Sequence, residues 1–264
     1  MTSMTARDTG RFVSRVAVVT GGSRGIGAAV ARRLAAEGAA VVIGYRSNRA
    51  TADALVSAIE ADGGKALAHG ADVADPGQSE ALIERAVAEF GRLDVLASCA
   101  GIEHFGALAD LTPADFDRVF AVNTRGQLFA AQHAAARMGE GGRIVLTSSV
   151  SASRAVFEHT LYAASKAAVE SMVLNLSAEL GRRGITINAI APGGTDTDMA
   201  SENAAGYQHP RLRGEMPLDQ WLSVHGALGR LATPEEIAAG YAYLASDDAA
   251  YMTGRTLRVD GGFF

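Results

Sequence analysis

A segment near the start of the chain constrains the fold more than any other. Residues 16–19 form an apolar run without alternation, as expected for a strand that is buried on both faces. A glycine-rich loop follows at 20–27, then a helical pattern that ends near Gly38, and then a second apolar run at 40–43. A strand, a glycine loop, a helix and a strand in this order predict one unit of a parallel α/β sheet.

The glycine-rich loop predicts a binding site for the pyrophosphate of a dinucleotide. Gly21, Gly25 and Gly27 allow the backbone to turn tightly and to approach a phosphate closely. The helix that begins beside them supplies free N–H groups and the positive end of its dipole. A glycine turn with a purely structural role is the alternative.

Composition and charge narrow the class of protein. The chain has 264 residues, 48% hydrophobic and 20% charged, which suits one large α/β domain with a sizeable core. Cys99 is the only cysteine, so no intrachain disulfide can form, and we expect a reducing, cytoplasmic location. A formal charge of −5 argues against nucleic acid as a partner, and no apolar run is long enough to span a membrane.

The polar N-terminus lacks the apolar core of a signal peptide. We expect residues 1–13 to form a flexible tail and residues 14–264 to form the folded domain. Residues 199–228 show no regular pattern, and a connection of this length favours a lid that holds the substrate.

Strand and helix patterns alternate along the rest of the chain. Further helices are expected at about 49–62, 76–90, 112–138, 160–180 and from 233, and further strands at about 65–70, 93–96, 142–148, 186–190 and 257–262. Seven strands with helical crossovers predict a single-domain α/β fold, a Rossmann-type doubly wound parallel sheet. Ligands are then expected at the carboxyl ends of the strands.

Three residues in the second half of the chain predict a site for proton transfer. Tyr162 and Lys166 are four positions apart and share one face of a helix, and Ser149 follows a strand pattern that ends at the same edge of the sheet. The phenol would act as the acid, and the serine hydroxyl would hold a carbonyl oxygen. A core tyrosine and a surface lysine are the alternative, and Ser148 and Ser151 are the other candidates for the serine.

The expected effect of Lys166 on Tyr162 can be estimated. A cation about 4 Å away, at an effective dielectric constant of ~20, contributes roughly 4 kcal/mol. That energy is equivalent to about three pKa units. We therefore expect Lys166 to lower the pKa of Tyr162 toward working pH.

Two motifs give the chain its resemblance to the short-chain dehydrogenase/reductase family. One is the loop pattern Thr-Gly-x3-Gly-x-Gly that ends at Gly27, whose spacing differs from the G-x-G-x-x-G fingerprint, and the other is Tyr162-x3-Lys166. The resemblance covers the chain after residue 13. It implies that Tyr162 gives a proton to a carbonyl while Lys166 binds the nicotinamide ribose, and Ser149 matches the serine of the family.

The resemblance assigns further residues to the catalytic and cofactor sites. Asn123 matches an asparagine that kinks a helix and holds a water next to the lysine, so it completes the expected catalytic set. Asp72 matches a residue that contacts the adenine, although it could instead cap the helix expected at 76–90. The residues expected to bind the cofactor are Gly21, Ser23, Arg24, Gly25, Ile26, Gly27, Tyr45, Arg46, Ser47, Asp72, Val73, Ala100, Gly101, Tyr162, Lys166, Pro192, Gly193, Thr195 and Thr197. No metal site is expected.

The chain departs from the family after its fourth strand. The usual Asn-Asn-Ala-Gly is here Ser98-Cys99-Ala100-Gly101, so two amides that usually pin neighbouring strands are missing. The contact of Ala100 and Gly101 with the cofactor depends mostly on backbone and should be kept. Cys99 has no base beside it in the sequence, which favours a buried filler over a nucleophile.

The end of the second strand indicates which nicotinamide cofactor binds. A site selective for NAD usually has an acid here, to bind the ribose hydroxyls. The chain has Arg46 and Ser47 instead, and Arg24 lies in the glycine loop. Two guanidinium groups and a hydroxyl suit a 2′-phosphate, so NADP(H) is expected. NAD, with Arg46 as a solvated surface charge, is the alternative.

Two stretches suggest the substrate class. Residues 106–127 and 191–199 resemble the fungal tri- and tetrahydroxynaphthalene reductases, and the chain also resembles 3-oxoacyl-carrier-protein reductases. The resemblance implies an NADPH-dependent ketoreductase for a cyclic or aromatic, polyketide-like ketone. The alternatives are an alcohol or sugar dehydrogenase working in the oxidative direction, a 3-oxoacyl thioester reductase, and a cofactor-binding protein without catalysis. Because the family is commonly tetrameric, a homotetramer is expected.

Overall fold

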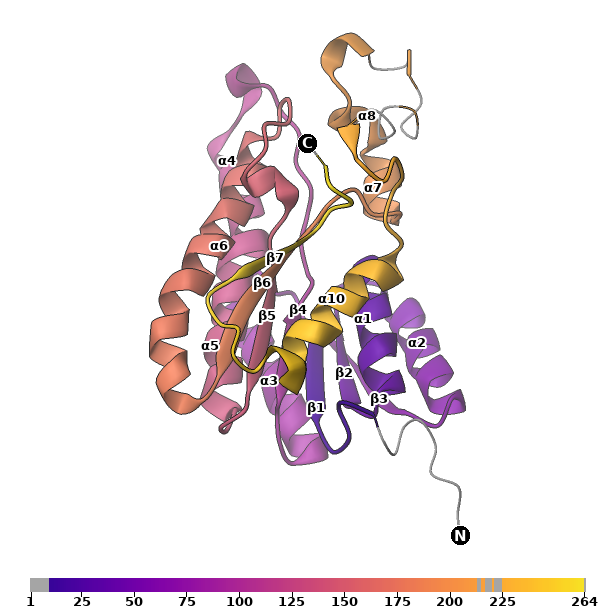
Figure 1. The fold of residues 1–264 in the computed structure, drawn as a ribbon, viewed down its shortest axis with the longest axis vertical. Helices are drawn as coiled ribbons and strands as arrows, with labels where there is room; N and C mark the ends of the chain where they lie inside the picture. Colours follow the sequence, from indigo (N-terminus) through magenta and orange to yellow (C-terminus); the bar gives the residue numbers. More distant parts are fainter. Residues whose placement is uncertain (1–9, 213–214, 217–219, 221–224, 264) are drawn as a thin grey trace.

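The protein contains a parallel sheet of seven strands in the order β3-β2-β1-β4-β5-β6-β7 (Figure 1). The computed structural model describes residues 10–212, 215–216, 220 and 225–263. The strands are β1 (Val16–Thr20), β2 (Ala40–Tyr45), β3 (Lys65–Gly70), β4 (Val95–Ser98), β5 (Arg143–Thr147), β6 (Thr186–Pro192) and β7 (Thr256–Val259). Every neighbouring pair is parallel, which confirms the predicted doubly wound sheet.

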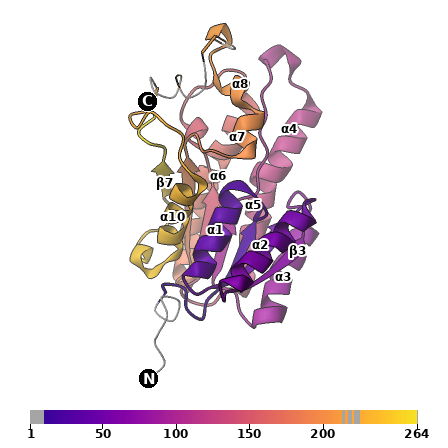
Figure 2. The ribbon, with the colours of Figure 1, turned by 90° about the vertical axis from the view of Figure 1, so that its right-hand side faces the viewer.

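Helices cover both faces of the sheet (Figures 1 and 2). The longer helices are α1 (Gly25–Ala36), α2 (Arg49–Ala61), α3 (Pro76–Phe90), α4 (Pro113–Phe120), α5 (Gly126–Arg137), α6 (Thr160–Leu180) and α10 (Pro234–Ala245). One core cluster joins the sheet to α1, α2 and α10, and a second joins it to α3, α5 and α6. Ala17 and Val19 of β1 belong to the first cluster, whereas Val16 and Val18 belong to the second. This two-sided burial explains why the apolar run of β1 shows no alternation.

The strand order reverses between β1 and β4. The chain starts in the middle of the sheet, runs outward to β3, and returns to place β4 on the other side of β1. Helices that cross over opposite faces leave a crevice at the carboxyl ends of these two strands, where ligands of such sheets bind. The loop after β1 and the loop after β4 border this crevice. Gly21 has a φ of +62°, and a Cβ on it would lie 2.8 Å from the Cα of Ala100, so no larger residue fits where the loops meet.

Phe12 is part of the core, although residues 1–13 were predicted to form a tail. Its side chain is 0% exposed, and its backbone N–H donates to the carbonyl of Glu37 at 2.9 Å. The prediction is therefore wrong for Phe12. A single aromatic residue in a polar stretch gives no periodic signal, which explains why the pattern missed it.

The helix predicted at 112–138 is interrupted. Thr112 and Asp115 form a capping box at the start of α4, as the Thr-Pro sequence indicated. Between α4 and α5 the chain makes a π-helical turn at Ala121–Arg125, which contains Asn123. Such turns insert one residue into a helix and often occur at functional sites.

The described part of residues 199–228 contains short helices. These are α7 (Asp198–Glu202), α8 (Ala204–Tyr207) and a 3₁₀ turn at Pro210–Leu212, so the expectation of an irregular chain is wrong for these residues. In Figure 1, α7 and α8 lie beyond the carboxyl ends of the strands. Among the described residues, no helix is long and apolar enough to cross a membrane.

Candidate active site

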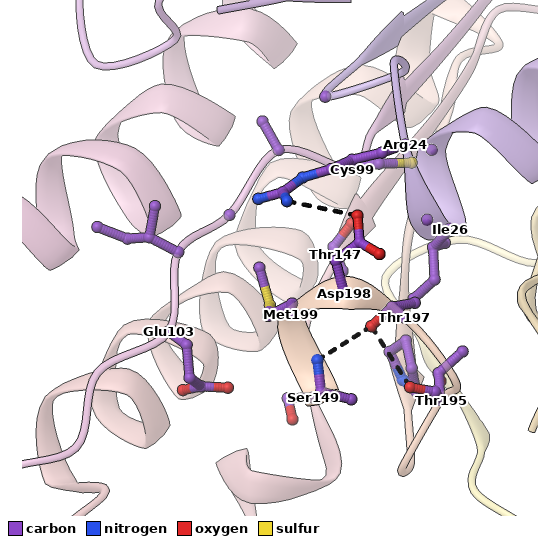
Figure 3. A pocket seen from close by; sticks show the side chains of 18 of the residues that line it. Arg24, Ile26, Cys99, Glu103, Thr147, Ser149, Thr195, Thr197, Asp198 and Met199 are labelled. Atoms are coloured by element: carbon purple, nitrogen blue, oxygen red, sulfur yellow. Dashed lines mark hydrogen bonds and ion pairs between the residues drawn. The ribbon is translucent and has the colours of Figure 1, made fainter. Parts of the chain in front are cut away.

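A cavity of about 480 Å³ lies along the carboxyl edge of the sheet (Figure 3). Every residue expected to bind the cofactor lines it except Tyr45, and of the expected catalytic residues Ser149, Tyr162 and Lys166 line it. Tyr45 instead packs its ring against Gly70. A Cβ added to Gly70 would lie 3.6 Å from the Tyr45 ring. The structure thus brings the glycine loop and the expected proton-transfer residues into one pocket.

The glycine-loop end of the pocket is rich in donors. Arg24, Arg46 and Ser47 line it together. The guanidinium of Arg24 lies 3.5 Å from carboxylate oxygens of Asp198 and Glu202, which joins the glycine loop to α7. No side chain caps α1 among the described residues, so N–H groups of its first turn are left for a ligand.

Asp72 lines the pocket and does not cap α3. Its Oδ1 accepts from the N–H of Ala74 at 2.9 Å, and it is Asp75 whose side chain accepts from the first turn of α3. The alternative that Asp72 caps this helix is therefore wrong. Its contact with an adenine stays a prediction.

The phenol of Tyr162 is hydrogen-bonded to Ser149. Burial and the negative charge of Glu103 raise the pKa of Tyr162, and the bond from Ser149 only partly opposes them. The expected lowering of this pKa by Lys166 is therefore wrong for this structure. The ammonium lies 5.5 Å from the centroid of the Tyr162 ring. Burial, which the estimate from sequence left out, is the largest influence on this pKa.

Lys166 is held by the backbone of β5. Its Nζ donates to the carbonyl oxygen of Thr147 at 3.0 Å, and the residue is only 2% exposed. Burial lowers the pKa of Lys166 to about 8, opposed by the carboxylate of Glu103. The lysine is thus part of the buried site and not a surface residue.

The hydroxyls of Ser148 and Ser149 have different partners. Ser148 donates to the carboxylate of Glu170 at 2.8 Å and to the carbonyl of Lys166 at 3.2 Å, so it is occupied by α6. Ser149 accepts from the N–H of Ser151 at 3.2 Å and bonds Tyr162. This geometry favours Ser149 over Ser148 as the group that meets a carbonyl oxygen.

Asn123 lies behind the pocket rather than on its wall. Its amide accepts from the N–H of Ile102 and donates to the carbonyl of the same residue, both at 2.9 Å, and it also donates to Ser165 Oγ at 3.1 Å. The side chain therefore ties the loop after β4 to α6. Its expected link to a water next to Lys166 stays a prediction.

Comparison with known proteins identifies relatives that match this protein along almost the whole chain. A family model described as enoyl-(acyl carrier protein) reductase matches residues 21–264. A versicolorin reductase of Emericella nidulans is 42% identical over 269 residues, which covers 99% of this chain and 100% of the relative. A probable tetrahydroxynaphthalene reductase of Zymoseptoria tritici is 39% identical over 257 residues, which covers 96% of each. The chain belongs to the short-chain dehydrogenase/reductase family.

A solved short-chain dehydrogenase supports the same assignment in three dimensions. The protein from Burkholderia cenocepacia, in complex with NADP, superposes with a TM-score of 0.87 at 41% identity and covers 96% of this chain and 98% of its own. The predicted family, its oxidoreductase class and its fold are thereby confirmed.

The departure from the family after β4 is compensated by hydroxyl groups. Thr147 donates to the carbonyl of Ser98 and shares a hydrogen bond with the hydroxyl of Tyr241, and Thr20 Oγ1 accepts from the N–H of Ala100 at 3.2 Å. These bonds join β1, β4, β5 and α10 where the two asparagines are missing. Burial raises the pKa of the Cys99 thiol to about 12, which argues against a nucleophile. Cys99 is half-buried and lines the pocket, so the expectation of a fully buried filler is wrong.

Sequence reasoning missed an acidic cluster beside Tyr162. It consists of Glu103, His159 and Tyr207, which we call the Glu103 cluster. Oε1 of Glu103 lies 2.5 Å from Nε2 of His159, and the hydroxyl of Tyr207 donates to Oε2 at 2.5 Å. The ring of His159 stacks on that of Tyr162, with centroids 4.6 Å apart. An acid two residues after Gly101 was a visible signal, but its partners come from distant segments.

Proposed function

We propose that this protein is an NADPH-dependent ketoreductase that acts on a cyclic or aromatic ketone. Its main support is the pair formed by Tyr162 and Ser149, which face the pocket that also contains the glycine loop. Relatives named as versicolorin and tetrahydroxynaphthalene reductases, about equally long and similar throughout, favour a polycyclic aromatic substrate.

The residues present fit a dinucleotide phosphate. The uncapped start of α1 and the close approach of Gly21 to Ala100 leave backbone N–H groups for a pyrophosphate. Arg46 and Ser47, with Arg24 nearby, suit a 2′-phosphate, and no acid follows β2 to bind a free ribose hydroxyl. When bound, NADPH supplies the hydride that the carbonyl carbon receives.

The chain's own residues would then handle the proton. Tyr162 donates its phenolic proton to the carbonyl oxygen, and Ser149 donates a hydrogen bond to that oxygen as negative charge develops. The raised pKa of Tyr162 keeps the phenol protonated, which suits reduction better than oxidation. Lys166 would hold the nicotinamide ribose. Asn123 would hold the loop after β4 against α6.

We also propose a cytoplasmic homotetramer with a substrate lid at 199–228. Phe116 on α4 is 47% exposed and Leu174 on α6 is 58% exposed, and such apolar groups on helices suit contact with a second copy. Analytical ultracentrifugation gives the number of copies directly.

Cofactor preference is tested by titration. We expect NADPH to bind at least about tenfold more tightly than NADH, which is about 1.4 kcal/mol. Arg46→Ala should remove this preference because the pocket loses a guanidinium for the phosphate. Arg49→Ala is the matched control, because Arg49 is exposed and pairs with Asp53 outside the pocket. Equal binding of NADH by the wild type would refute the phosphate site.

Turnover is tested by NADPH consumption with a panel of cyclic ketones, aromatic ketones and a 3-oxoacyl thioester. We expect Tyr162→Phe to bind NADPH normally and to lose activity by about 10²- to 10⁴-fold, the usual contribution of a general acid. Tyr251→Phe, at a fully exposed tyrosine, should keep full activity. Substantial activity in Tyr162→Phe would exclude the proposed proton donor.

A further inference from the structure

The Glu103 cluster places a carboxylate at the wall of the pocket. The Glu103 side chain is 4% exposed, yet it lines the cavity together with Tyr207. Figure 3 shows it across the pocket from Thr195 and Thr197. A buried carboxylate is costly unless its oxygens accept hydrogen bonds, so the partners of each oxygen indicate what is still needed.

Protein donors satisfy most, but not all, of the carboxylate. Oε1 accepts from His159 Nε2 and from the backbone N–H of His104, the latter at 3.1 Å. Oε2 accepts from Tyr207. A carboxylate has about four acceptor sites. Tyr207 is the one donor to Oε2 among the described residues, so Oε2 keeps capacity for another, and Glu103 lines the pocket.

The surroundings of His159 support this count. Its Nδ1 is buried and has no hydrogen-bond partner among the described residues, so the side chain bonds through Nε2 to Oε1 of Glu103. With a proton on Nε2, the ring donates to Oε1 and fixes the carboxylate. His159 also lies between the rings of Phe105 and Tyr162, with centroids 4.4 and 4.6 Å away, so the ring cannot turn to serve another acceptor.

Part of the pocket wall is apolar. It contains the side chains of Val156, Met199, Leu231 and Phe263. An aromatic substrate would find contact with these groups, and a hydroxyl on it would find an acceptor at Glu103. The carbonyl would meet Tyr162, whose ring stacks on that of His159.

We propose that Glu103 accepts a hydrogen bond from a hydroxyl group of the substrate and thereby selects hydroxylated cyclic ketones. This rests on the ketoreductase function proposed above and adds the residue that determines specificity. His159 and Tyr207 position the carboxylate for this contact. Tyr207 belongs to α8, so its bond to Glu103 also joins the proposed lid to the loop after β4.

The test compares α-tetralone with its isomers that carry one phenolic hydroxyl. We expect the wild type to have a higher kcat/KM for at least one hydroxy isomer than for α-tetralone. Glu103→Gln should reduce this preference by about tenfold or more, the usual effect of losing a hydrogen bond to a charged group. The ratio of the kcat/KM values for the two ketones is used because Glu103 also raises the pKa of Tyr162. That effect changes the reduction of both ketones by a common factor.

Tyr207→Phe is the matched variant. It removes one donor and loosens α8 but keeps the carboxylate, so the preference for the hydroxyl should be retained. If Glu103 only holds α8 in place, both variants would lose activity toward both ketones. Neither variant would then change the ratio of the kcat/KM values for the two ketones. An unchanged ratio in Glu103→Gln, or a wild type without any preference, overturns the proposal.

Binding separates this proposal from the function on which it rests. The dissociation constants of the same ketones are measured by calorimetry on the NADP-loaded protein. If no ketone is reduced but the hydroxy isomer binds more tightly, and this depends on Glu103, the ketoreductase function fails while the recognition site stands. If the ketones are reduced and their dissociation constants are the same with and without the hydroxyl, only the recognition site fails.

Discussion

Lys166 gives a direct test of how strongly the site is buried. The chain contains two lysines, Lys65 and Lys166. Lys166 is 2% exposed, and burial lowers its pKa from 10.5 to about 8. That difference corresponds to about 3 kcal/mol by which the folded protein disfavours the charged form.

The sign of the effect on stability follows from proton counts. Between pH 8 and 10.5 the unfolded chain holds a proton on Lys166 that the folded protein has lost, so the free energy of unfolding rises with pH. Below this range Lys166 is protonated in both the folded and the unfolded protein, so the folded protein has the full free-energy cost of the buried charge. Relative to Lys166→Met, the free energy of unfolding of the wild type should rise by about 2 kcal/mol from about pH 7.5 to about pH 9.5.

The assay is a pH titration of ¹³C-labelled lysine by NMR, together with urea unfolding of both proteins without nucleotide. With two lysines, the signal of Lys166 is the one missing from Lys166→Met, and the exposed Lys65 is the internal reference. We expect the Lys166 signal to titrate near pH 8. A midpoint close to the ordinary value of about 10.4, with a stability difference that does not change with pH, would refute the reasoning.

Two further substitutions test the core. Phe12→Ala should lower the free energy of unfolding by about 3–5 kcal/mol because its ring is fully buried, whereas Val13→Ala, at a side chain 44% exposed, should cost far less. Equal costs in urea unfolding would contradict the burial of Phe12. Thr147→Val should cost about 1–3 kcal/mol because it leaves the hydroxyl of Tyr241 without this partner. Thr186→Val is its control, since the buried Thr186 hydroxyl has no partner among the described residues, and an equal loss there would show that the bonds of Thr147 are unimportant.

Much of the fold could be predicted because its signals are local. The strand, glycine loop, helix and strand from residue 16 to 43 each follow from apolar runs and glycines that lie next to one another in the sequence. The same holds for the caps at Thr112 and Thr233, whose Thr-Pro pairs identify the starts of α4 and α10. The π turn at Ala121–Arg125 could not be predicted from periodicity, because one inserted residue hardly changes a helical pattern.

The Glu103 cluster shows what sequence patterns leave out. Glu103 follows β4, His159 precedes α6, and Tyr207 ends α8, so no window of the sequence contains two of them. Their meeting depends on the sheet order, which places β4 beside β5, and on α8, which lies beyond the ends of the strands. A pattern can indicate that an acid follows a strand, but its partners depend on the tertiary fold.

The same limit explains why the pKa of Tyr162 was predicted in the wrong direction. The estimate from sequence included one nearby cation and no desolvation, so it favoured a phenol that loses its proton easily. In the structure, burial disfavours the charged forms of both Tyr162 and Lys166, and Glu103 adds a negative charge that the sequence pattern did not place there. A phenol that stays protonated can give a proton to a developing alkoxide but cannot readily take one from an alcohol. Burial and Glu103 together therefore keep the phenol in the protonated form that the proposed reduction needs, which the sequence motif alone leaves open.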